Sequence, residues 1–427
     1  MATAEIKTEN NDSTFITEED IKQILSAYNP QEEISLQDYA VHSASSKMLG
    51  FLAEYWKIKV HLANRQFLYF FVKAISRANA AKAKMARETQ LFIKELRFYS
   101  EIKTFLETPG KSLKVILCSK SVIEYNALVF EDLNAKQYEI RNKFERFDMA
   151  HTLQALKTLA RFHASSIVFE ERKKIEKQEY KINDDFAHVL GKGGYDISSE
   201  WYIQCMTGAL EAIKAFSKYD DKAIESIERH WHNIWTTALE LSNYAPGRRN
   251  VICHRDLWNN NIMFHYQKGD KDESVPDKCM FIDFQAVRYQ PPASDLAVML
   301  CCNLEPKFRK ANMSLFLDFY YEELRKILRK NKIEMNDIIT RKEFLISAEE
   351  QMKWGLVVCA CLLPQIWIDD DLSTKIFTDD VQFDEVLSKN KGLFIKNMMK
   401  NNLDYRQKVM TIFEELSDQY CFNDITN

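Results

Sequence analysis

The sequence predicts an α+β protein of two lobes, in which a small N-terminal antiparallel sheet with a helix precedes a larger, mainly helical lobe. The chain has 427 residues, which is long enough to bury a large core and favours two or more lobes. Runs rich in aromatic and β-branched residues fill the stretch from Ile34 to Arg77, whereas apolar residues recur at helical spacing from Asp148 onward. We therefore divide the chain into residues 1–130 and 131–427.

The first lobe begins with polar residues 1–16, which we expect to be flexible. Thr17 is suited to cap a helix that starts with three acids and continues to Tyr28. One long helix is expected at Ala78–Lys103. The expected strands are Leu36–Ser43, Ala53–His61, Gln66–Ser76, Lys114–Ser119 and Asn126–Phe130.

The second lobe is expected to be helical on both sides of one short strand-rich stretch. The charge run Glu170–Glu179 is typical of a solvated surface. The glycine-rich segment Gly191–Tyr195 is interpreted as a flexible turn, because it lacks the flanking strand and the Lys-Ser/Thr ending of a phosphate loop. The expected helices are Met149–Phe169, Trp201–Ser217, Ala223–Asn243, Leu296–Cys302, Phe308–Arg329, Arg341–Trp367 and Val381–Leu416.

The composition argues against several classes of protein. A net charge of −4 provides no general attraction to nucleic acid or lipid. The nine cysteines are scattered without Cys-x-x-Cys spacing, which favours reduced thiols in a cytoplasmic protein. No stretch approaches 18 uninterrupted apolar residues, and the N-terminus lacks a signal-peptide core. We expect no nucleic-acid partner, no membrane span and a monomeric chain.

Polar residues that suit phosphoryl transfer gather between Val251 and Asp295. In VICHRDLWNNNIMF the order is His-x-Asp-x-x-x-x-Asn, which places Asp256 five residues before Asn261. A second acid, Asp283, directly follows a short apolar run that is typical of a buried strand. Two carboxylates and an amide around one hairpin are the groups that a phosphoryl-transfer site requires.

The chemistry suggests a role for each of these side chains. Transfer of the γ-phosphoryl group of ATP depends on positioning and on neutralising phosphate charge, and Mg²⁺ supplies that charge through oxygen ligands. We expect Asp283 to be the bridging Mg²⁺ ligand and Asn261 to hold a second metal ion through its amide oxygen. Asp256 would accept or orient the proton of the attacking hydroxyl.

This stretch resembles a known family. His254-Arg255-Asp256-Leu257-Trp258-x-x-Asn261, Phe281-Ile282-Asp283-Phe284-Gln285 and Asp295-Leu296 are similar to the motifs of the ecdysteroid kinase-like (CHK kinase-like) family of insects. That family belongs with the choline and aminoglycoside phosphotransferases in the protein-kinase-like fold. The resemblance covers the chain from about Ile34 to the last helix and implies an ATP- and Mg²⁺-dependent kinase of small molecules.

The resemblance also implies roles for residues of the first lobe. Lys73 would reach the α- and β-phosphates and would be held by Glu95, with Glu88 as the competing partner. The loop that contains Gly50 would cover the nucleotide. Glu131 and Leu133 would bind adenine through backbone groups at the hinge. In the second lobe, Asp295 would brace the backbone of the catalytic loop.

The acceptor is expected to be a small alcohol. Asp295 follows Asp283 by only twelve positions, which leaves no room for the long segment on which protein kinases bind peptides. The family name implies an ecdysteroid hydroxyl, and a plant or xenobiotic alcohol, as in detoxification, fits equally. An apolar acceptor would suit the C-terminal residues Trp354, Ile366 and Trp367. Two alternatives stay open: a choline- or aminoglycoside-like kinase of a cationic acceptor, and a pseudokinase that binds a hormone or protein.

Overall fold

The computed structural model describes residues 16–31, 34–45, 49–106, 115–116, 127–191, 193–267 and 275–422. Residues 1–15 of the segment expected to be flexible lie outside this description, and Ile16 is buried. Residues 46–48 of the expected nucleotide-covering loop also lie outside it. The strand expected at 114–119 is described only in the backbone of Val115–Ile116, as β4.

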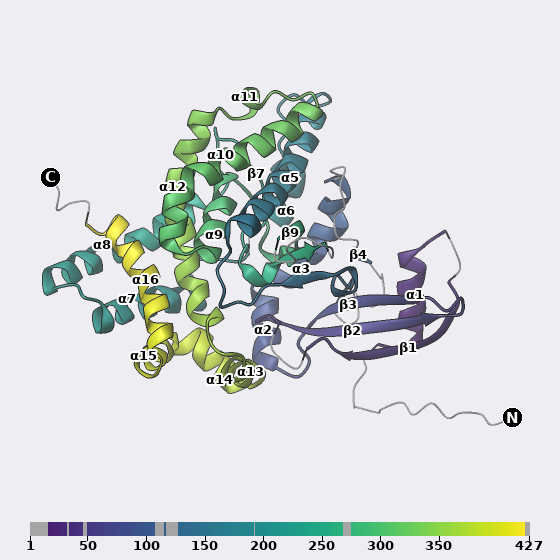
Figure 1. Cartoon of the computed structure of the whole chain (residues 1–427), viewed down its shortest axis with the longest axis horizontal. Helices are drawn as coiled ribbons and strands as arrows, with labels where there is room; N and C mark the ends of the chain where they lie inside the picture. The colour runs from purple at the N-terminus through teal and green to yellow at the C-terminus, as the bar shows by residue number, and fades with distance from the viewer. Residues whose placement is uncertain are drawn as a thin grey trace.

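The first lobe is built on an antiparallel sheet with the strand order β1-β2-β3-β5-β4. In Figure 1 this sheet lies on one side of the molecule and the helical lobe on the other. The α+β class with a small sheet followed by a larger helical part is therefore confirmed, whereas the boundary at 130/131 stays a prediction. The other strands are β1 (Leu36–Ser43), β2 (Ala53–Leu62), β3 (Phe67–Ile75) and β5 (Ala127–Glu131).

Alternation along β3 determines which way its lysine points. Phe70, Val72 and Ala74 pack into one cluster with Ile21 and other apolar residues of helix α1 (Glu18–Tyr28). Because successive side chains of a strand point to opposite faces, Lys73 faces the other side, towards the helical lobe. As predicted, Thr17 caps α1, in a capping box with Asp20.

The prediction of a single helix at Ala78–Lys103 is wrong. The structure has α2 (Ala80–Glu88) and α3 (Leu91–Arg97), followed by a π-helical turn and a short 3₁₀ turn that end at Phe105. Gln90 separates α2 from α3 because its backbone is left-handed, with φ of 56°. The break gives α3 its own direction and places it beside the 3₁₀ turn Phe284–Ala286.

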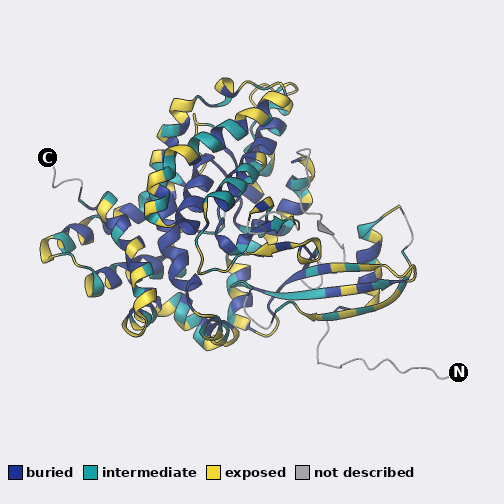
Figure 2. Cartoon of the chain, in the orientation of Figure 1, coloured by how far each residue is buried: buried dark blue, intermediate teal, exposed yellow. Residues whose placement is uncertain are grey.

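The helical lobe is packed around helices that are buried along most of their length, as the dark blue residues in Figure 2 show. Helix α9 crosses α12 so closely that a Cβ atom at Gly355 would meet the backbone of Ala297 at 2.6 Å. This contact fixes the start of α9, which carries Asp295. The helices are α5 (Met149–Lys174), α6 (Ile182–Leu190), α7 (Glu200–Phe216), α8 (Asp221–Leu241), α9 (Ala293–Asn303), α10 (Pro306–Lys330), α11 (Met335–Ile338), α12 (Arg341–Ile366), α13 (Asp370–Thr378), α14 (Asp380–Asp384), α15 (Lys391–Asn401) and α16 (Leu403–Tyr420).

Two sequence interpretations in this lobe need correction. The segment Val381–Leu416 is divided among α14, a π-helical turn, α15 and α16. The charge run after Phe169 is not wholly solvated, because Glu170 is fully buried. Its carboxylate lies 3.0 Å from Arg249 and accepts a hydrogen bond from the backbone N–H of Ile182, so the charge is paired inside the lobe.

Two small sheets position the polar motif. β7 (Val251–Cys253) pairs with β10 (Arg288–Gln290), and β8 (Ile262–Tyr266) lies between β6 (Tyr138–Ile140) and β9 (Pro276–Phe281). The catalytic loop, residues 254–261, thus connects β7 to β8, and Asp283 follows β9. In the described ranges, no single helix has the length and apolar composition of a membrane span, although α12 and α13, bent by 92° at their junction, reach it jointly.

Candidate active site

A cavity of about 1140 Å³ brings together all the residues that the sequence predicted for catalysis and for binding nucleotide and metal. They come from the sheet, from α3, from the end of β5, from the catalytic loop and from the segment after β9. The roles proposed for them stay predictions, but their placement in one cavity is a finding. The predicted residues that line it are Gly50, Lys73, Glu95, Glu131, Leu133, Asp256, Asn261 and Asp283.

Lys73 connects the two lobes at the centre of this cavity. Its Nζ lies 2.6 Å from Oε2 of Glu95 and 2.7 Å from Oδ1 of Asp283, and it also donates to Gln285. Burial opposes the charge of Lys73, but the two carboxylates raise its pKa above the ordinary value. Glu88 is exposed and makes its ion pair with Lys84, so Glu95 is the partner of Lys73 in the structure.

Glu95 also fixes the segment that carries Asp283. Its Oε1 accepts a hydrogen bond from the backbone N–H of Phe284 at 3.1 Å while Oε2 binds Lys73. Burial raises the pKa of Glu95, and the charge of Lys73 opposes that change. One carboxylate therefore links α3, β3 and the Asp-Phe-Gln segment.

The catalytic loop presents Asp256 and Asn261 side by side. The amide nitrogen of Asn261 donates to the backbone oxygen of Asp256 at 2.8 Å and to its Oδ2 at 3.0 Å. Burial and then the charge of Asp283 raise the pKa of Asp256 to about 7. A carboxylate with a pKa near neutrality can accept a proton at physiological pH, which suits the role of a general base.

His254 ties this loop to the strand that precedes Asp283. Its Nδ1 accepts from the backbone N–H of Asp256 at 3.3 Å, so its Nε2 carries the proton and donates to the oxygen of Ile282 at 2.9 Å. Burial lowers the pKa of His254, which keeps the ring neutral. The neutral imidazole thus sets the distance between the segments that carry the two acids.

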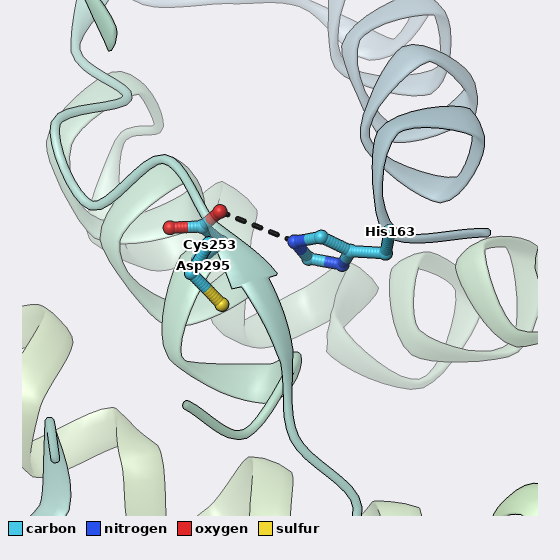
Figure 3. A group of neighbouring side chains, drawn as sticks. All are labelled: His163, Cys253 and Asp295. Atoms are coloured by element: carbon cyan, nitrogen blue, oxygen red, sulfur yellow. Dashed lines mark hydrogen bonds and ion pairs between the residues drawn. The ribbon is translucent and has the colours of Figure 1, made fainter. Parts of the chain in front are cut away.

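Asp295 braces the catalytic loop, as predicted. Its Oδ2 and Oδ1 accept the backbone N–H groups of His254 and Arg255 at 2.6 and 2.7 Å. Figure 3 shows His163 pointing at the Asp295 carboxylate beside Cys253. The distance from Nε2 of His163 to Oδ2 is 3.1 Å, and its Nδ1 accepts from the hydroxyl of Tyr320.

The spacing of these three side chains would also suit a metal ion, because their ligand atoms lie within 4.8 Å of one another. Their bonding favours a structural role instead. Both oxygens of Asp295 already accept backbone N–H groups. The thiol of Cys253 donates to backbone oxygens, and burial raises its pKa well above the ordinary value, so the sulfur keeps its proton.

The residues proposed as metal ligands do fit a divalent cation. Because the amide nitrogen of Asn261 is held by Asp256, its oxygen is left to face the cavity. Asp283 uses Oδ1 to bind Lys73, and Oδ2 makes no hydrogen bond to the described part of the chain. Two carboxylates, Glu95 and Asp283, contact the single ammonium group of Lys73, and the charge of Asp283 also acts on Asp256. This excess of negative charge suits a hard dication with oxygen ligands.

The nucleotide-covering loop has a physical reason for its one glycine. A Cβ atom at Gly50 would overlap the hydroxyl of Tyr55, which lies on β2 directly opposite Lys73 in the strand pairing. Tyr55 also lines the cavity. The close approach of the loop to the sheet therefore requires the smallest residue at position 50.

The predicted hinge lies at the edge of the same cavity. The backbone oxygen of Leu133 already accepts from the N–H groups of Lys136 and Tyr138, both at 3.0 Å. The N–H of Leu133 makes no hydrogen bond to the described residues, so it is the group that this residue can offer to adenine. Asp132 turns its N–H towards the oxygen of Tyr69.

Sequence reasoning placed the acceptor wall on the wrong residues. Trp354 is fully buried, and Cζ of Arg255 lies 4.9 Å from the centre of its ring. Ile366 and Trp367 are buried and do not line the cavity. The lining beyond the catalytic loop includes residues that the sequence analysis did not select, among them Phe51, Tyr195, Trp201, Trp258, Leu362 and Gln365. Among these residues, only Trp258 could have been found from its place in the sequence, because it stands two positions after Asp256.

The residues predicted for catalysis and for binding nucleotide and metal all lie within a segment of the chain that matches a known family. The sequence model of the ecdysteroid kinase-like family matches residues 47–333. Among curated proteins, the uncharacterized kinase-like protein D1044.1 of Caenorhabditis elegans is 27% identical over 195 residues, which are 45% of this chain and 46% of that protein. The uncharacterized oxidoreductase dhs-27 of the same organism is 24% identical over 166 residues, 36% of this chain and 20% of that protein.

The matches thus span less than half of either relative's own length. Both are nematode proteins, so the predicted link with insects stays a prediction. Among solved structures, the amicoumacin kinase hAmiN in complex with AMP-PNP, Ca²⁺ and Ami is similar over 93% of this chain and 92% of that chain. Its sequence identity is 12% and its TM-score is 0.37.

Proposed function

This chain belongs to the ecdysteroid kinase-like family, and we propose that it transfers the γ-phosphoryl group of ATP to a hydroxyl of a small, largely apolar molecule, with Mg²⁺ as cofactor. The observation that carries the proposal is the position of Lys73. Its ammonium bridges Glu95 and Asp283 at 2.6 and 2.7 Å, in the cavity that also holds Asp256 and Asn261. Such an arrangement is what phosphoryl transfer requires of a protein.

The nucleotide would lie between the sheet and the catalytic loop. Lys73 would contact its phosphates, the backbone at Leu133 would bind adenine, and Gly50 would allow the loop to cover it. Asp283 and Asn261 would hold Mg²⁺, which when bound supplies positive charge against the phosphates. These residues position the phosphates without forming a covalent bond to them.

Asp256 would act on the acceptor. A hydroxyl placed beside its carboxylate would lose its proton as the oxygen attacks phosphorus, and the bond to the ADP leaving group would break on the opposite side. The pKa of Asp256, raised to about 7, supports this role. The acceptor would be an ecdysteroid or a plant or xenobiotic alcohol, because the wall beyond Asp256 is rich in aromatic and aliphatic side chains.

A cationic acceptor such as choline or an amino sugar is the second candidate. Asp196 and Glu200 line the cavity, and aromatic rings can bind a quaternary ammonium group. Asp196, however, already accepts hydrogen bonds from the backbone and hydroxyl of Ser198 at 2.8 and 2.7 Å. Both bonds go to Oδ1, which holds this carboxylate in its own turn but keeps its charge. We favour the apolar alcohol because the wall is rich in aromatic and aliphatic side chains.

The test is ATP consumption by the purified protein with Mg²⁺, measured against ecdysteroids, plant sterols and glycosides, choline and amino sugars. Addition of one phosphate to a steroid or another apolar alcohol, detected by mass, is the expected result. Turnover on choline or amino sugars alone would favour the second candidate. If the protein neither bound Mg-ATP nor turned over any acceptor, the pseudokinase would be the better account. The Asp256→Asn variant serves as the control for contaminating kinases.

A further inference from the structure

Helix α7 contacts both α12 and α15, in the part of the molecule away from the sheet (Figure 1). Residues of α7 and α12 line the cavity. Gln365 lies near the end of α12 and is 5% exposed, yet it lines the cavity. Its Oε1 accepts from Nε1 of Trp201 on α7 at 3.2 Å and from Nζ of Lys391 at the start of α15 at 2.8 Å. Three helices therefore fix the orientation of one carboxamide.

The orientation of this carboxamide follows from the donors around it. An indole N–H and an ammonium group can only donate, so the oxygen of Gln365 must face them. Its Nε2 makes no hydrogen bond to any residue that the structure describes. This nitrogen is not among the side-chain atoms that are buried without a partner, so it is open to the cavity that Gln365 lines. It can therefore donate to an acceptor atom of a molecule bound there.

The group behind Gln365 is also charged. Lys391 is almost fully buried, 3.0 Å from Sγ of Cys205 and 4.9 Å from the centre of the Trp201 ring. Burial opposes ionisation of the Cys205 thiol, but hydrogen bonding from Cys361 and the charge of Lys391 outweigh it and lower the pKa to about 7. The thiolate form of Cys205 would offset the charge of Lys391, so the group that a cation in the cavity would meet is the amide N–H of Gln365, a donor that cannot accept from an ammonium group.

We propose that Gln365 determines the acceptor class: its amide donates to a carbonyl or hydroxyl oxygen of a neutral, largely apolar acceptor packed against Trp201, Trp258 and Leu362. Lys391 is a positioning residue, which acts by holding the carboxamide. This inference rests on the proposed function and deepens it. The acceptor would need two oxygens, one for phosphoryl transfer at Asp256 and another for recognition at Gln365.

The variant that tests this is Gln365→Glu. It keeps the shape and an oxygen for Trp201 and Lys391, but it replaces the donor that faces the cavity by an acceptor. Binding is measured by tryptophan fluorescence in the Asp256→Asn background with Mg²⁺ and a non-hydrolysable ATP analogue. The probes are ecdysone, which carries several hydroxyls and a carbonyl, cholesterol, which carries one hydroxyl, and choline.

We expect ecdysone to bind at least 10-fold more tightly than cholesterol, and Gln365→Glu to weaken ecdysone binding about 10- to 100-fold. Cholesterol binding should change less than 3-fold, and the affinity for the ATP analogue should be unchanged, which shows that the fold is intact. Lys391→Met should weaken ecdysone binding by a smaller factor, and it should add nothing to the effect of Gln365→Glu. Equal loss for both steroids would overturn the proposal.

The result separates this inference from the proposed function. If ecdysone binds in a Gln365-dependent way but wild-type protein phosphorylates nothing, the recognition site stands and the kinase proposal fails. If the protein phosphorylates an alcohol whose KM is the same in Gln365→Glu, the kinase proposal stands and this site is refuted. Tight binding of choline by the wild type, with no steroid bound, refutes the acceptor class.

Discussion

Replacing Asp256 by asparagine should make the protein more stable while it removes activity. Burial and the neighbouring charge of Asp283 raise the pKa of Asp256 from 3.8 to about 7. The folded state therefore holds this proton more tightly than the unfolded chain. Below about pH 4 the group is protonated in both states and does not lower the free energy of unfolding. Ionisation lowers that free energy increasingly between about pH 4 and pH 7, and by a constant amount above about pH 7.

The size of the effect follows from the shift. About three pKa units correspond to about 4 kcal/mol at ~1.4 kcal/mol per unit, which is an upper limit. Because Asp256 is mostly buried but keeps some exposure, solvent screens part of this cost, and about 1–3 kcal/mol is the expected gain at pH 8. With an unfolding entropy of ~2 cal/mol/K per residue, a chain of this length should gain about 1–3 °C in Tm.

The assay is thermal unfolding of both proteins at pH 8 and pH 5.5, in EDTA and without nucleotide. The gain from Asp256→Asn should be roughly halved at pH 5.5, and kcat at pH 8 should fall about 10²- to 10⁴-fold. Glu139→Gln is the matched control, because Glu139 is an exposed carboxylate that lines the same cavity. A variant that is no more stable at pH 8, or that gains more at pH 5.5, would refute the reasoning.

Three further substitutions test the nucleotide end of the site. Asp283→Asn should raise the Mg²⁺ concentration for half-maximal turnover at least ~10-fold, and an unchanged Mg²⁺ titration would remove Asp283 from the metal site. Glu95→Gln keeps a hydrogen-bond acceptor for Lys73 but loses the negative charge, so KM for ATP should rise about 5- to 20-fold. Glu88→Gln is the control for this variant and should leave KM for ATP unchanged. Gly50→Ala should raise KM for ATP about 10-fold, because the added methyl group clashes with the hydroxyl of Tyr55. Adding Tyr55→Phe to this variant should lower KM part of the way back. If KM did not fall, the clash with the Tyr55 hydroxyl would not be the cause.

The catalytic acids could be predicted from the sequence because their placement is local. The loop of residues 254–261 joins two paired strands, so the spacing from Asp256 to Asn261 directly fixes their geometry. Asp283 ends a strand in the same way. In each case a short apolar run and a polar residue at its end were enough.

The acceptor wall could not be predicted because it depends on long-range packing. Trp201 and Trp354 both lie in helices and both look like core residues in the sequence. The structure buries one beneath Arg255 and brings the other to the cavity beside Gln365, which is 164 positions away along the chain. No local pattern distinguishes them, and the glycine-rich segment before Tyr195 gave no sign that it borders the cavity.

The same contrast explains how the site keeps its backbone geometry. Arg255 and Asp283 have φ of 74° and 65°, a conformation that costs a non-glycine residue about 1–3 kcal/mol. Left to its own backbone preference, each residue would adopt a negative φ. Asp295 holds the N–H of Arg255 from α9, and His254 holds Ile282, the residue before Asp283. The backbone of these two residues is therefore maintained by bonds to elements distant in the sequence, so loss of the Asp295 brace should impair catalysis before it unfolds the lobe.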